Sequence, residues 1–536
     1  MADPRQHLLA FWSKILSMQN DQKNTKGDAV LQRVLEVIPG FLTWTLLLSP
    51  IWLGILYPTL VIYILTFFSV YWAYLAVKHF RGLFIGYKKH KVELAIDWWS
   101  ECLELSKDWE RLPDPETRPK DVNSIVHFLL IPTYNEPADV IKNSIDSVFA
   151  QTMPHNQILL VCAVEEKYSQ RVLADIDTAL NNRKKELYGF FAFIHPAGIP
   201  GEAKGAGGAN RTWGARHTVA ELIKQGVDIK NFIFSTIDGD HVIHPQYLAR
   251  LTHLYLSTNK RNNHFYSTAV HLFSNNYWRV PTVMRIEASS VTLATLSNWI
   301  SGMPQTRETF SAYSSSLQTL IDADYWDVAL GIDDTVFYWR AFFARDGNFT
   351  GVCHYIPYSA DAVEGTSYFN SYKSLYKQLL RWGWGVIVFP LSVRGFVRYK
   401  KIPFSKKLLW IYTQLKNKTL LVSIVFLVTF GFYILTATNK YVKQSNFAYS
   451  LPYSISIMLS SILVLIIPIT ILKIKIVGGI PRLLPWWRKA MFLMEGPLIV
   501  INLLTFSLFP FLEAQTRMLL GKRMKDLYFT PKMARK

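Results

Sequence analysis

Long apolar stretches and mixed stretches alternate along the chain. Residues 41–77 are almost wholly apolar, and three further apolar runs follow in the last third of the sequence. A helix needs about 20 apolar residues to cross a bilayer, so each later run predicts one membrane-spanning helix. The first stretch is long enough for a hairpin of two such helices, with its break near Pro50 or Pro58. The later runs are residues 418–437, 451–472 and 494–512.

Between the membrane stretches, the apolar runs are only of strand length. Helical patterns at 138–150 and 168–187 lie between them. Strands that alternate with helices predict an α/β domain whose mostly parallel sheet is covered on both faces. Ligands of such sheets bind at the carboxyl ends of the strands, so the residues after each run are candidates for a site. The runs are residues 125–131, 158–164, 190–194 and 232–237.

The chain is strongly basic, and its basic residues are unevenly placed. Half of the residues are hydrophobic, 18% are charged and the net charge is +19, which excludes an ordinary soluble protein. The basic residues cluster beside the apolar stretches, as the positive-inside pattern and anionic lipid favour. No basic recognition motif is present, so nucleic acid is not an expected partner. The clusters are Lys78, Arg81, Lys88, Lys89 and Lys91, and Arg394, Arg398, Lys400, Lys401, Lys406 and Lys407.

The basic tail conflicts with a simple count of crossings. Both ends of the first hairpin are expected in the cytoplasm, and three later crossings would leave residues 514–536 outside. The basic residues of this tail favour the cytoplasmic side instead. Either one segment is re-entrant, or a further helix lies within 402–417 or 480–493.

Asp238-Gly-Asp240 places two carboxylates directly after the fourth strand-length run. Gly239 lets the backbone turn tightly. Carboxylates suit Mg²⁺ or Mn²⁺, and such a cation can neutralise a leaving diphosphate. The alternative is a solvated turn after a strand. We expect Asp240 and Asp238 to be metal ligands, and His241 beside them to be a packed loop histidine.

Asp333-Asp334 is a second pair of carboxylates, and both are candidate catalytic residues. Transfer of a group to a hydroxyl needs a base near that hydroxyl. A carboxylate beside a like charge has a raised pKa, which makes it a stronger base. The alternative is an aspartate that caps a helix begun by Thr335. The two roles are compatible if Asp333 is structural and Asp334 is the base.

Gln378, Arg381 and Trp382 stand at positions i, i+3 and i+4, so a helix places them on one face. Arg381 can pair with a diphosphate, and the ring of Trp382 can stack on the apolar face of a sugar. At a membrane boundary the alternative is an interfacial tryptophan beside an arginine that reaches out to water.

Two further segments and one strand end are candidates for nucleotide contacts. Residues 201–210 form a glycine-dense loop whose backbone N–H groups, with Lys204, could cradle phosphate; a flexible linker is the alternative. Glu165 ends the second strand-length run, where it could reach a uracil or ribose edge or be solvated. The first run ends where the sheet turns toward a nucleotide, in Thr133, Tyr134, Asn135 and Glu136.

Taken together and in this order, the four motifs resemble those of the membrane-embedded glycosyltransferase family 2 enzymes, the cellulose, chitin and hyaluronan synthase group. The resemblance covers residues 125–385, and the ending Thr530-Pro-Lys532 is similar to that of cellulose-synthase-like bacterial proteins. It implies a GT-A nucleotide-sugar-binding domain between transmembrane helices and a reaction that inverts the anomeric centre. The motifs are Ile131-Pro-Thr-Tyr-Asn-Glu-Pro137, Asp238-Gly-Asp240, Asp333-Asp334 and Gln378-Leu-Leu-Arg381-Trp382.

The resemblance also implies roles for single residues. By position, Asp240 is the more direct metal ligand, Asp334 is the base and Lys204 contacts uridine diphosphate. Two departures stand out: Glu165-Glu166 replaces a usual Asp-Asp pair, and Ile-Asp-Asp replaces Thr-Glu-Asp. The motif that binds the pyrophosphate and the acceptor end matches Gln378, Arg381 and Trp382.

The sequence therefore predicts a multi-pass protein of the cell membrane with a cytoplasmic catalytic domain. We expect it to transfer a hexose from a UDP-linked donor to a growing glycan, processively. The alternatives are a non-processive transferase that acts on a lipid or lipid-linked acceptor, and a scaffold or polymer-export subunit with an inactive domain. The expected parts are an N-terminal segment (1–37), a membrane hairpin (38–78), a linker (79–122), the catalytic domain (123–355), the Gln378 segment with interfacial helices (356–410), further membrane helices (411–513) and a basic tail (514–536).

Overall fold

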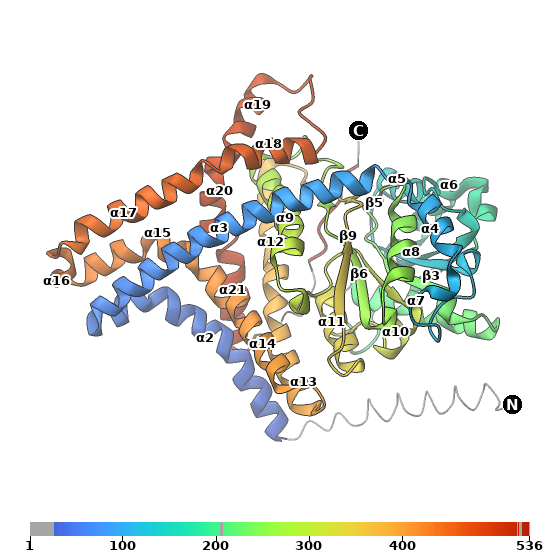
Figure 1. The fold of residues 1–536 in the computed structure, drawn as a ribbon, viewed down its shortest axis with the longest axis horizontal. Helices are drawn as coiled ribbons and strands as arrows, with labels where there is room; N and C mark the ends of the chain where they lie inside the picture. Colours follow the sequence, from blue (N-terminus) through green and yellow to red (C-terminus); the bar gives the residue numbers. More distant parts are fainter. Residues whose placement is uncertain (1–25, 204–206, 523, 525–527, 535–536) are drawn as a thin grey trace.

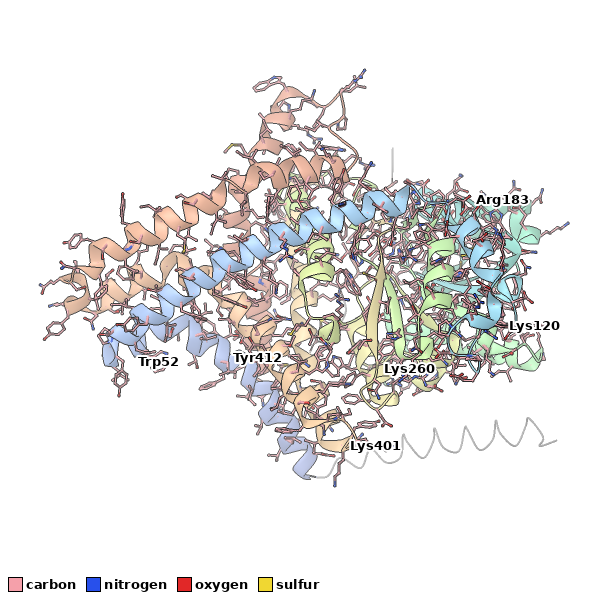
Figure 2. The ribbon with its side chains drawn as sticks, in the orientation of Figure 1. Trp52, Lys120, Arg183, Lys260, Lys401 and Tyr412 are labelled. Carbon is pink, nitrogen blue, oxygen red and sulfur yellow. The ribbon has the colours of Figure 1, made fainter. Side chains whose placement is uncertain are left out.

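The computed structural model describes residues 26–203, 207–522, 524 and 528–534. Long helices fill one half of the molecule, and a domain built around a sheet fills the other (Figure 1). Trp52 and Tyr412 lie among the long helices, whereas Lys120, Arg183 and Lys260 lie on the sheet-containing domain (Figure 2). The apolar and mixed stretches of the sequence thus occupy different halves of the molecule.

A seven-stranded sheet with the order β3-β2-β1-β4-β8-β6-β9 forms the centre of this domain. The first four strands run parallel, and only β8 is antiparallel to its neighbours β4 and β6. The predicted mixed, mostly parallel sheet is confirmed, and the four strand-length runs correspond to β1–β4. A small second sheet has the order β5-β10-β7. The strands are β1 (Val126–Thr133), β2 (Ile158–Glu165), β3 (Gly189–His195), β4 (Phe232–Thr236), β5 (Val242–Ile243), β6 (His264–Thr268), β7 (His271–Leu272), β8 (Tyr313–Ser316), β9 (Thr350–His354) and β10 (Tyr358–Ser359).

Helices cover both faces of the sheet because its central strands are apolar on both faces. Leu129 and Ile131 of β1 pack toward α5, α6 and α8, whereas Phe128 and Leu130 pack toward α7, α10 and α11. The predicted helix 138–150 is α5, and the predicted helix 168–187 is α6, which ends earlier than expected. The helices of this half are α4 (Trp98–Ser106), α5 (Ala138–Phe149), α6 (Ser169–Leu180), α7 (Gly207–Lys224), α8 (Tyr247–Ser257), α9 (Thr282–Ser301), α10 (Leu317–Asp322), α11 (Asp333–Ala344) and α12 (Tyr368–Gly383).

Five helical segments of the described residues are long and apolar enough to cross a membrane. The most apolar window of the segment Phe447–Ile476 has a mean hydropathy of 2.7, and only 6% of it is buried, a surface that water would disfavour. The helices are α2 (Lys26–Leu56), α3 (Pro58–Leu94), α13 (Val388–Arg398), α14 (Phe404–Leu415), α15 (Leu421–Thr438), α16 (Lys440–Lys443), α17 (Phe447–Leu463), α18 (Ile466–Ile476), α19 (Trp486–Leu493), α20 (Glu495–Leu504) and α21 (Phe509–Leu519).

Two expectations about these helices are resolved. The hairpin breaks at Tyr57, because Pro58 takes the first turn of α3, while Pro50 lies inside α2. A further crossing within 402–417 or 480–493 is wrong. The first range belongs to the continuous helical segment Phe404–Thr438, and the second contains only α19, whose eight residues span about 12 Å.

The last candidate span differs from the others. It consists of two short helices, α20 and α21, separated by a turn, and it runs across the direction of α3 and α17 (Figure 1). The guanidinium of Arg33 at the start of α2 donates to the carbonyl oxygen of Met518 (2.7 Å), and Thr43 donates to Gln515 (2.6 Å). On its other side α21 packs on α12, where an added Cβ at Gly383 would lie 3.0 Å from Ala514, so this segment joins α2 to the sheet-containing half. The re-entrant segment stays a prediction.

Helix α3 fixes the two halves against each other. An added Cβ at Gly82 would lie 2.5 Å from the hydroxyl of Ser297, and one at Gly86 would lie 2.8 Å from Leu296, both on α9. Only glycine permits this close approach of two helices. The long helices thus hold the sheet-containing domain, and its strand ends, at a fixed distance from the apolar half.

Candidate active site

The carboxyl ends of β1, β2 and β4 meet at one edge of the sheet. Thr133 ends β1, and its hydroxyl donates to the carbonyl oxygen of Ala163 in β2 (3.3 Å). The side chain of Asn210 on α7 donates to the carbonyl oxygens of both Ala163 (2.8 Å) and Thr133 (3.2 Å). Helix α7 therefore ties the strand ends together at the place where the sequence predicts a site.

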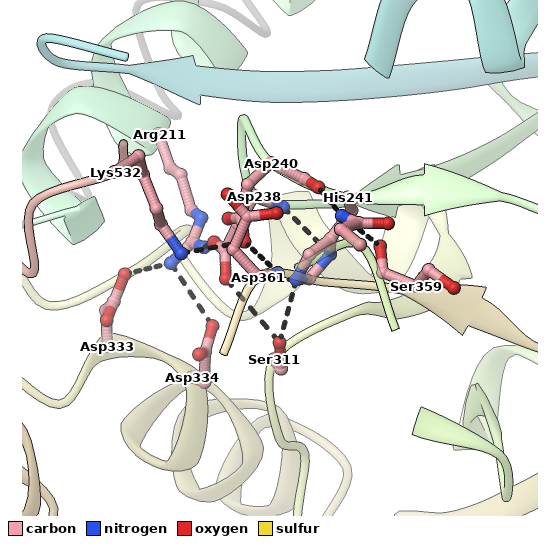
Figure 3. Close-up of polar contacts among 11 residues, drawn as sticks. Arg211, Asp238, Asp240, His241, Ser311, Asp333, Asp334, Ser359, Asp361 and Lys532 are labelled. Atoms are coloured by element: carbon pink, nitrogen blue, oxygen red, sulfur yellow. Dashed lines mark hydrogen bonds and ion pairs between the residues drawn. The ribbon is translucent and has the colours of Figure 1, made fainter. Parts of the chain in front are cut away.

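Arg211 is the centre of the site, and the sequence did not single it out. Its side chain is 4% exposed, and its two terminal nitrogens reach three carboxylates. One pairs with Asp238 (2.5 Å) and the other with Asp334 (3.2 Å) and, more closely, with Asp333 (Figure 3). One buried cation thus brings the second and third motifs of the sequence together.

Gly207 and Gly208 have no side chains, and this allows Arg211 to reach its position. Helix α7 begins at Gly207, and an added Cβ at Gly208 would lie 2.8 Å from the Cβ of Asp333. A flexible linker is therefore the wrong interpretation of residues 207–210, because they start a helix packed on Asp333. Lys204 lies outside the described residues, so the phosphate-cradle role of this loop stays a prediction.

Asp240 is buried, and its carboxylate already accepts two hydrogen bonds from the chain. Its Oδ2 accepts from the ammonium of Lys532 (2.7 Å) and from the backbone N–H of Asp361 (2.8 Å). Burial alone would raise the pKa of Asp240, but Lys532 and His241 outweigh it and hold the pKa at about 2. Asp240 is therefore an ionised carboxylate that a cation stabilises.

Glu136 supports the turn between the two aspartates. It is buried, its Oε2 accepts the backbone N–H of Tyr134 (2.7 Å), and an added Cβ at Gly239 would lie 3.3 Å from its carboxyl carbon. Burial raises the pKa of Glu136 to about 7. Asn135 beside it accepts from Arg171 (2.8 Å). These contacts give Glu136 and Gly239 a shared packing role next to Asp240.

His241 and Ser311 complete the surroundings of Asp238. The Nδ1 of His241 accepts the backbone N–H of Asp238 (3.1 Å), which leaves Nε2 to carry the proton 3.5 Å from the Asp238 carboxylate. Ser311 lies 3.4 Å from the same Nε2 and has a left-handed backbone with φ of 54°. Strained backbone of this kind is often found at functional sites. His241 is a packed histidine that also orients an aspartate of the site.

Asp333 and Asp334 open helix α11. The helix-capping role considered for Asp333 is wrong: the capping position is Ile332, and the carboxylate of Asp333 turns to Arg211 instead. The carbonyl oxygen of Asp334 accepts from Thr309 (2.5 Å). Burial raises the pKa of Asp334 well above its usual range, and Asp333 adds to the rise while Arg211 opposes it. A raised pKa is what the predicted role of Asp334 as a base requires.

Helix α12 brings the fourth motif beside this cluster. The charge of Arg381 on this helix acts to lower the pKa of Asp334. The ring of Trp382 meets Phe310 edge-on at 6.1 Å, and Phe310 stacks on His271 at 5.7 Å. Gln378 is half-buried on the same helix. The motif thus faces the catalytic domain rather than open water.

Glu165 has a different neighbourhood from the aspartates. Its carboxylate lies 3.0 Å from Nδ1 of His195, whose Nε2 lies 2.9 Å from Glu202. Burial would lower the pKa of His195, but the two carboxylates raise it above its usual value. The predicted contact of Glu165 with a uracil or ribose edge stays a prediction. One oxygen of its carboxylate already pairs with His195.

The aspartates fit a divalent cation that is shared with a substrate. No group of three metal-ligating side chains is found among the described residues. Mg²⁺ and Mn²⁺ at phosphate-transfer sites are commonly held by one or two carboxylates plus the phosphates of the substrate. The ammonium on Asp240 shows that this position accepts positive charge. Asp240 and Asp238 are thus the residues that would hold the metal, and the fit depends on a phosphate-bearing partner.

Comparisons with known proteins give a distant structural likeness only. Neither a protein-family model nor a curated protein sequence matches the chain. The mannosyltransferase PcManGT from Pyrobaculum calidifontis, in complex with GDP-Man and Mn2+, is 14% identical, with 83% of this chain and 100% of that chain covered and a TM-score of 0.38. S. aureus TarS 1-349 in complex with UDP-GlcNAc is 10% identical, with 74% and 93% covered and a TM-score of 0.28. At these TM-scores we base no conclusion on the likeness.

Proposed function

We propose that this protein is a membrane-bound inverting glycosyltransferase that moves a hexose from a nucleotide sugar, UDP-linked, to a growing glycan. The observation that carries the proposal is the meeting of Asp238 and Asp334 on Arg211, with Asp240 two residues beyond Asp238 and paired with Lys532, at the carboxyl ends of the strands. Such strand ends are where α/β domains bind nucleotides. Two carboxylates for a cation and a third with a raised pKa are what a transfer from a diphosphate to a hydroxyl needs.

On the donor side, the chain supplies both the ligands of a cation and fixed positive charge. Bound Mg²⁺ or Mn²⁺ would neutralise the diphosphate as it leaves. Arg211 holds Asp238 in place, and Arg381 on α12, whose charge acts on Asp334, is proposed to pair with the diphosphate. Thr133, Tyr134 and Glu165 at the ends of β1 and β2 are proposed to contact the nucleotide.

On the acceptor side, Asp334 is the proposed base. It takes the proton of the acceptor hydroxyl as that oxygen forms its bond to the anomeric carbon, and the bond from that carbon to the diphosphate breaks on the opposite face. The diphosphate leaves with the electron pair, so the anomeric configuration is inverted. Gln378 and Trp382 would hold the acceptor end, since an aromatic ring packs well on the apolar face of a sugar.

We propose a membrane location with the catalytic domain in the cytoplasm. The support is the apolar exposed surface of α17 and α18 and the basic residues beside the long helices. A single cysteine placed at Lys184 on the domain should react with a membrane-impermeant label in inverted vesicles only. Labelling in intact cells would contradict this topology.

A donor panel tests the proposed function. Purified protein in detergent or liposomes is incubated with UDP-, GDP- and CDP-linked hexoses, and free nucleotide and product size are both measured. Release of nucleotide that Asp334→Asn abolishes supports a transferase, and a ladder of products supports processive synthesis. A single sugar on a lipid would support the non-processive alternative. No turnover of any donor would favour an inactive scaffold.

A further inference from the structure

A short segment near the end of the chain, Tyr528–Ala534, lies across the candidate site. The hydroxyl of Tyr528 donates to Ser374 on α12 (2.8 Å), and Lys377 stands over its ring at 4.8 Å. The ring of Phe529 packs on Tyr134 with 4.7 Å between centroids. The segment is therefore held at both α12 and the end of β1, the two elements on which the acceptor and donor motifs stand.

The middle of the segment is buried in the site. Thr530 is 6% exposed, and its hydroxyl has no hydrogen-bond partner among the described residues. The side chain of Lys532 is 16% exposed, and its ammonium lies 2.7 Å from Oδ2 of Asp240. Arg279 donates to the carbonyl oxygen of Ala534 (3.2 Å) and fixes the far end.

This ion pair uses one of the two carboxylate oxygens of Asp240 that a metal could bind. A carboxylate oxygen has two lone pairs, and Oδ2 of Asp240 already accepts from both Lys532 and the backbone N–H of Asp361. A second cation at the same carboxylate would also be repelled by the ammonium, strongly so in a buried place. Lys532 and a divalent cation are thus alternatives at Asp240.

We propose that the 528–534 segment is a tethered competitor of the divalent cation, with the ammonium of Lys532 in the place of the metal on Asp240. Binding of metal and donor requires Lys532 to leave, so the segment sets the metal concentration at which the site opens. The inference rests on the proposed function, because it takes Asp240 as a metal ligand.

The tether explains how one ammonium can compete with a doubly charged ion. Being attached to the chain, Lys532 acts at a high effective concentration, and the rings of Tyr528 and Phe529 keep it near Asp240. The apparent dissociation constant of the metal is the intrinsic constant divided by the fraction of molecules in which Lys532 has left the site. A loss of the ammonium should therefore tighten metal binding, whereas the loss of an ordinary phosphate-binding lysine would not.

The test is Mn²⁺ binding with UDP present at a fixed concentration, which supplies the phosphates but no sugar, and a protein-free titration corrects for the Mn²⁺ that UDP binds. The full chain in detergent is titrated with Mn²⁺, and free Mn²⁺ is followed by electron paramagnetic resonance. We expect Lys532→Met to bind Mn²⁺ about 10-fold more tightly than the wild type, or more, since a buried charged hydrogen bond is removed from the competing state. Lys522→Met is the matched control, because Lys522 is exposed on the same stretch of chain, and it should bind like the wild type.

A second variant covers the case that Lys532→Met does not fold. Phe529→Ala keeps the ammonium but removes its anchor on Tyr134, and should tighten Mn²⁺ binding by a smaller factor. The inference is overturned if both variants bind Mn²⁺ as the wild type does or more weakly, while Asp240→Ala abolishes binding; the proposed function then stands alone. If neither the wild type nor any variant binds Mn²⁺, the inference and the metal-dependent mechanism fail together.

Discussion

Two buried clusters of charge hold distant parts of this chain together, and they are built differently. In the candidate active site, Arg211 forms ion pairs with three aspartates, and Lys532 forms one with Asp240. Four carboxylates thus share two cations. They come from the end of β4 and the start of α11, and the cations come from α7 and the last described residues of the chain.

The second cluster lies between α9 and the helices α18 and α20. Glu495 accepts from Arg285 (2.5 Å) and from Lys473 (2.7 Å), and each of the three side chains is less than a tenth exposed. Glu287 nearby accepts from Asn502 (2.5 Å) and Ser507 (3.1 Å). Both carboxylate oxygens of Glu495 thus have a cationic partner from the chain itself.

The difference in charge balance indicates a binding role for the first cluster and a structural role for the second. In the site cluster, four carboxylates are paired with two cations and Arg381 acts on Asp334, so the carboxylates outnumber the cations, which a protein tolerates where a cationic or metal-bound partner arrives. The second cluster has its charges matched within the chain, and it joins the catalytic domain to the membrane helices. We therefore expect changes in the first cluster to act on turnover and changes in the second to act on stability.

The largest effect should come from Asp240. Asp240→Ala removes the main carboxylate of the metal position, and we expect kcat to fall about 10³-fold or more, because a metal supplies several kcal/mol of charge stabilisation. Chelation should have the same effect on the wild type. Transfer assays with and without excess chelator measure both. Full activity in excess chelator would remove the metal from the mechanism.

Asp334→Asn should be nearly as severe. It keeps the shape of the side chain but cannot accept a proton, so kcat should fall about 10²–10⁴-fold while donor binding survives. Asp346→Asn is the control and should leave kcat unchanged, because Asp346 lies just beyond the end of α11 and pairs with the exposed Lys401. Near-normal transfer by Asp334→Asn would make Asp333 or another group the base.

The dependence of activity on pH tests the same assignment of Asp334 as the base. Burial raises the pKa of Asp334 well above the usual value of about 3.8, and the base works only when deprotonated. Activity should therefore be lost as the pH falls through this raised pKa, at a higher pH than an ordinary aspartate would cause. A kcat/KM profile of the wild type should show the acidic limb, and a limb at the ordinary value would contradict the assignment.

Glu495→Gln probes the other cluster. It leaves Arg285 and Lys473 buried without a counter-charge, which typically costs about 3–5 kcal/mol. Glu110→Gln is the matched control, since Glu110 pairs with Arg118 at an exposed position, where a pair is worth about 1 kcal/mol at most. Thermal unfolding in detergent compares them. The comparison of the two clusters breaks down if Glu495→Gln is stable but inactive.

The sequence predicts the scaffold of the site well because the scaffold leaves local patterns. Apolar runs such as 125–131 coincide with buried strands such as β1, and Asp238 follows β4 as parallel-sheet geometry requires. The pairing of Asp333 with Arg211 instead of a helix cap could not be predicted, because capping depends on local sequence and this ion pair does not.

Sequence patterns did not point to the pairing of the two cations of the site, Arg211 and Lys532, for the same reason. Lys532 and Asp240 are 292 positions apart, so no spacing or periodicity connects them. Arg211 did carry a weak signal: it is a polar residue on the buried face of α7, one position beyond the glycine-dense loop. A buried arginine that directly follows such a loop is reason to search for carboxylates elsewhere in the chain.

Trp382 gives the smallest expected effect and lies between the two clusters. It packs on Phe310 near the aspartates and also against the apolar group that contains Tyr277 and Phe492, beside the second cluster. Trp382→Ala should weaken acceptor binding by about 1–3 kcal/mol, as other aromatic stacking contacts do. Transfer should fall more than hydrolysis of the donor, and Trp382→Phe should restore much of it. Equal loss of transfer and hydrolysis, together with a lower unfolding temperature, would instead assign Trp382 to the structural cluster.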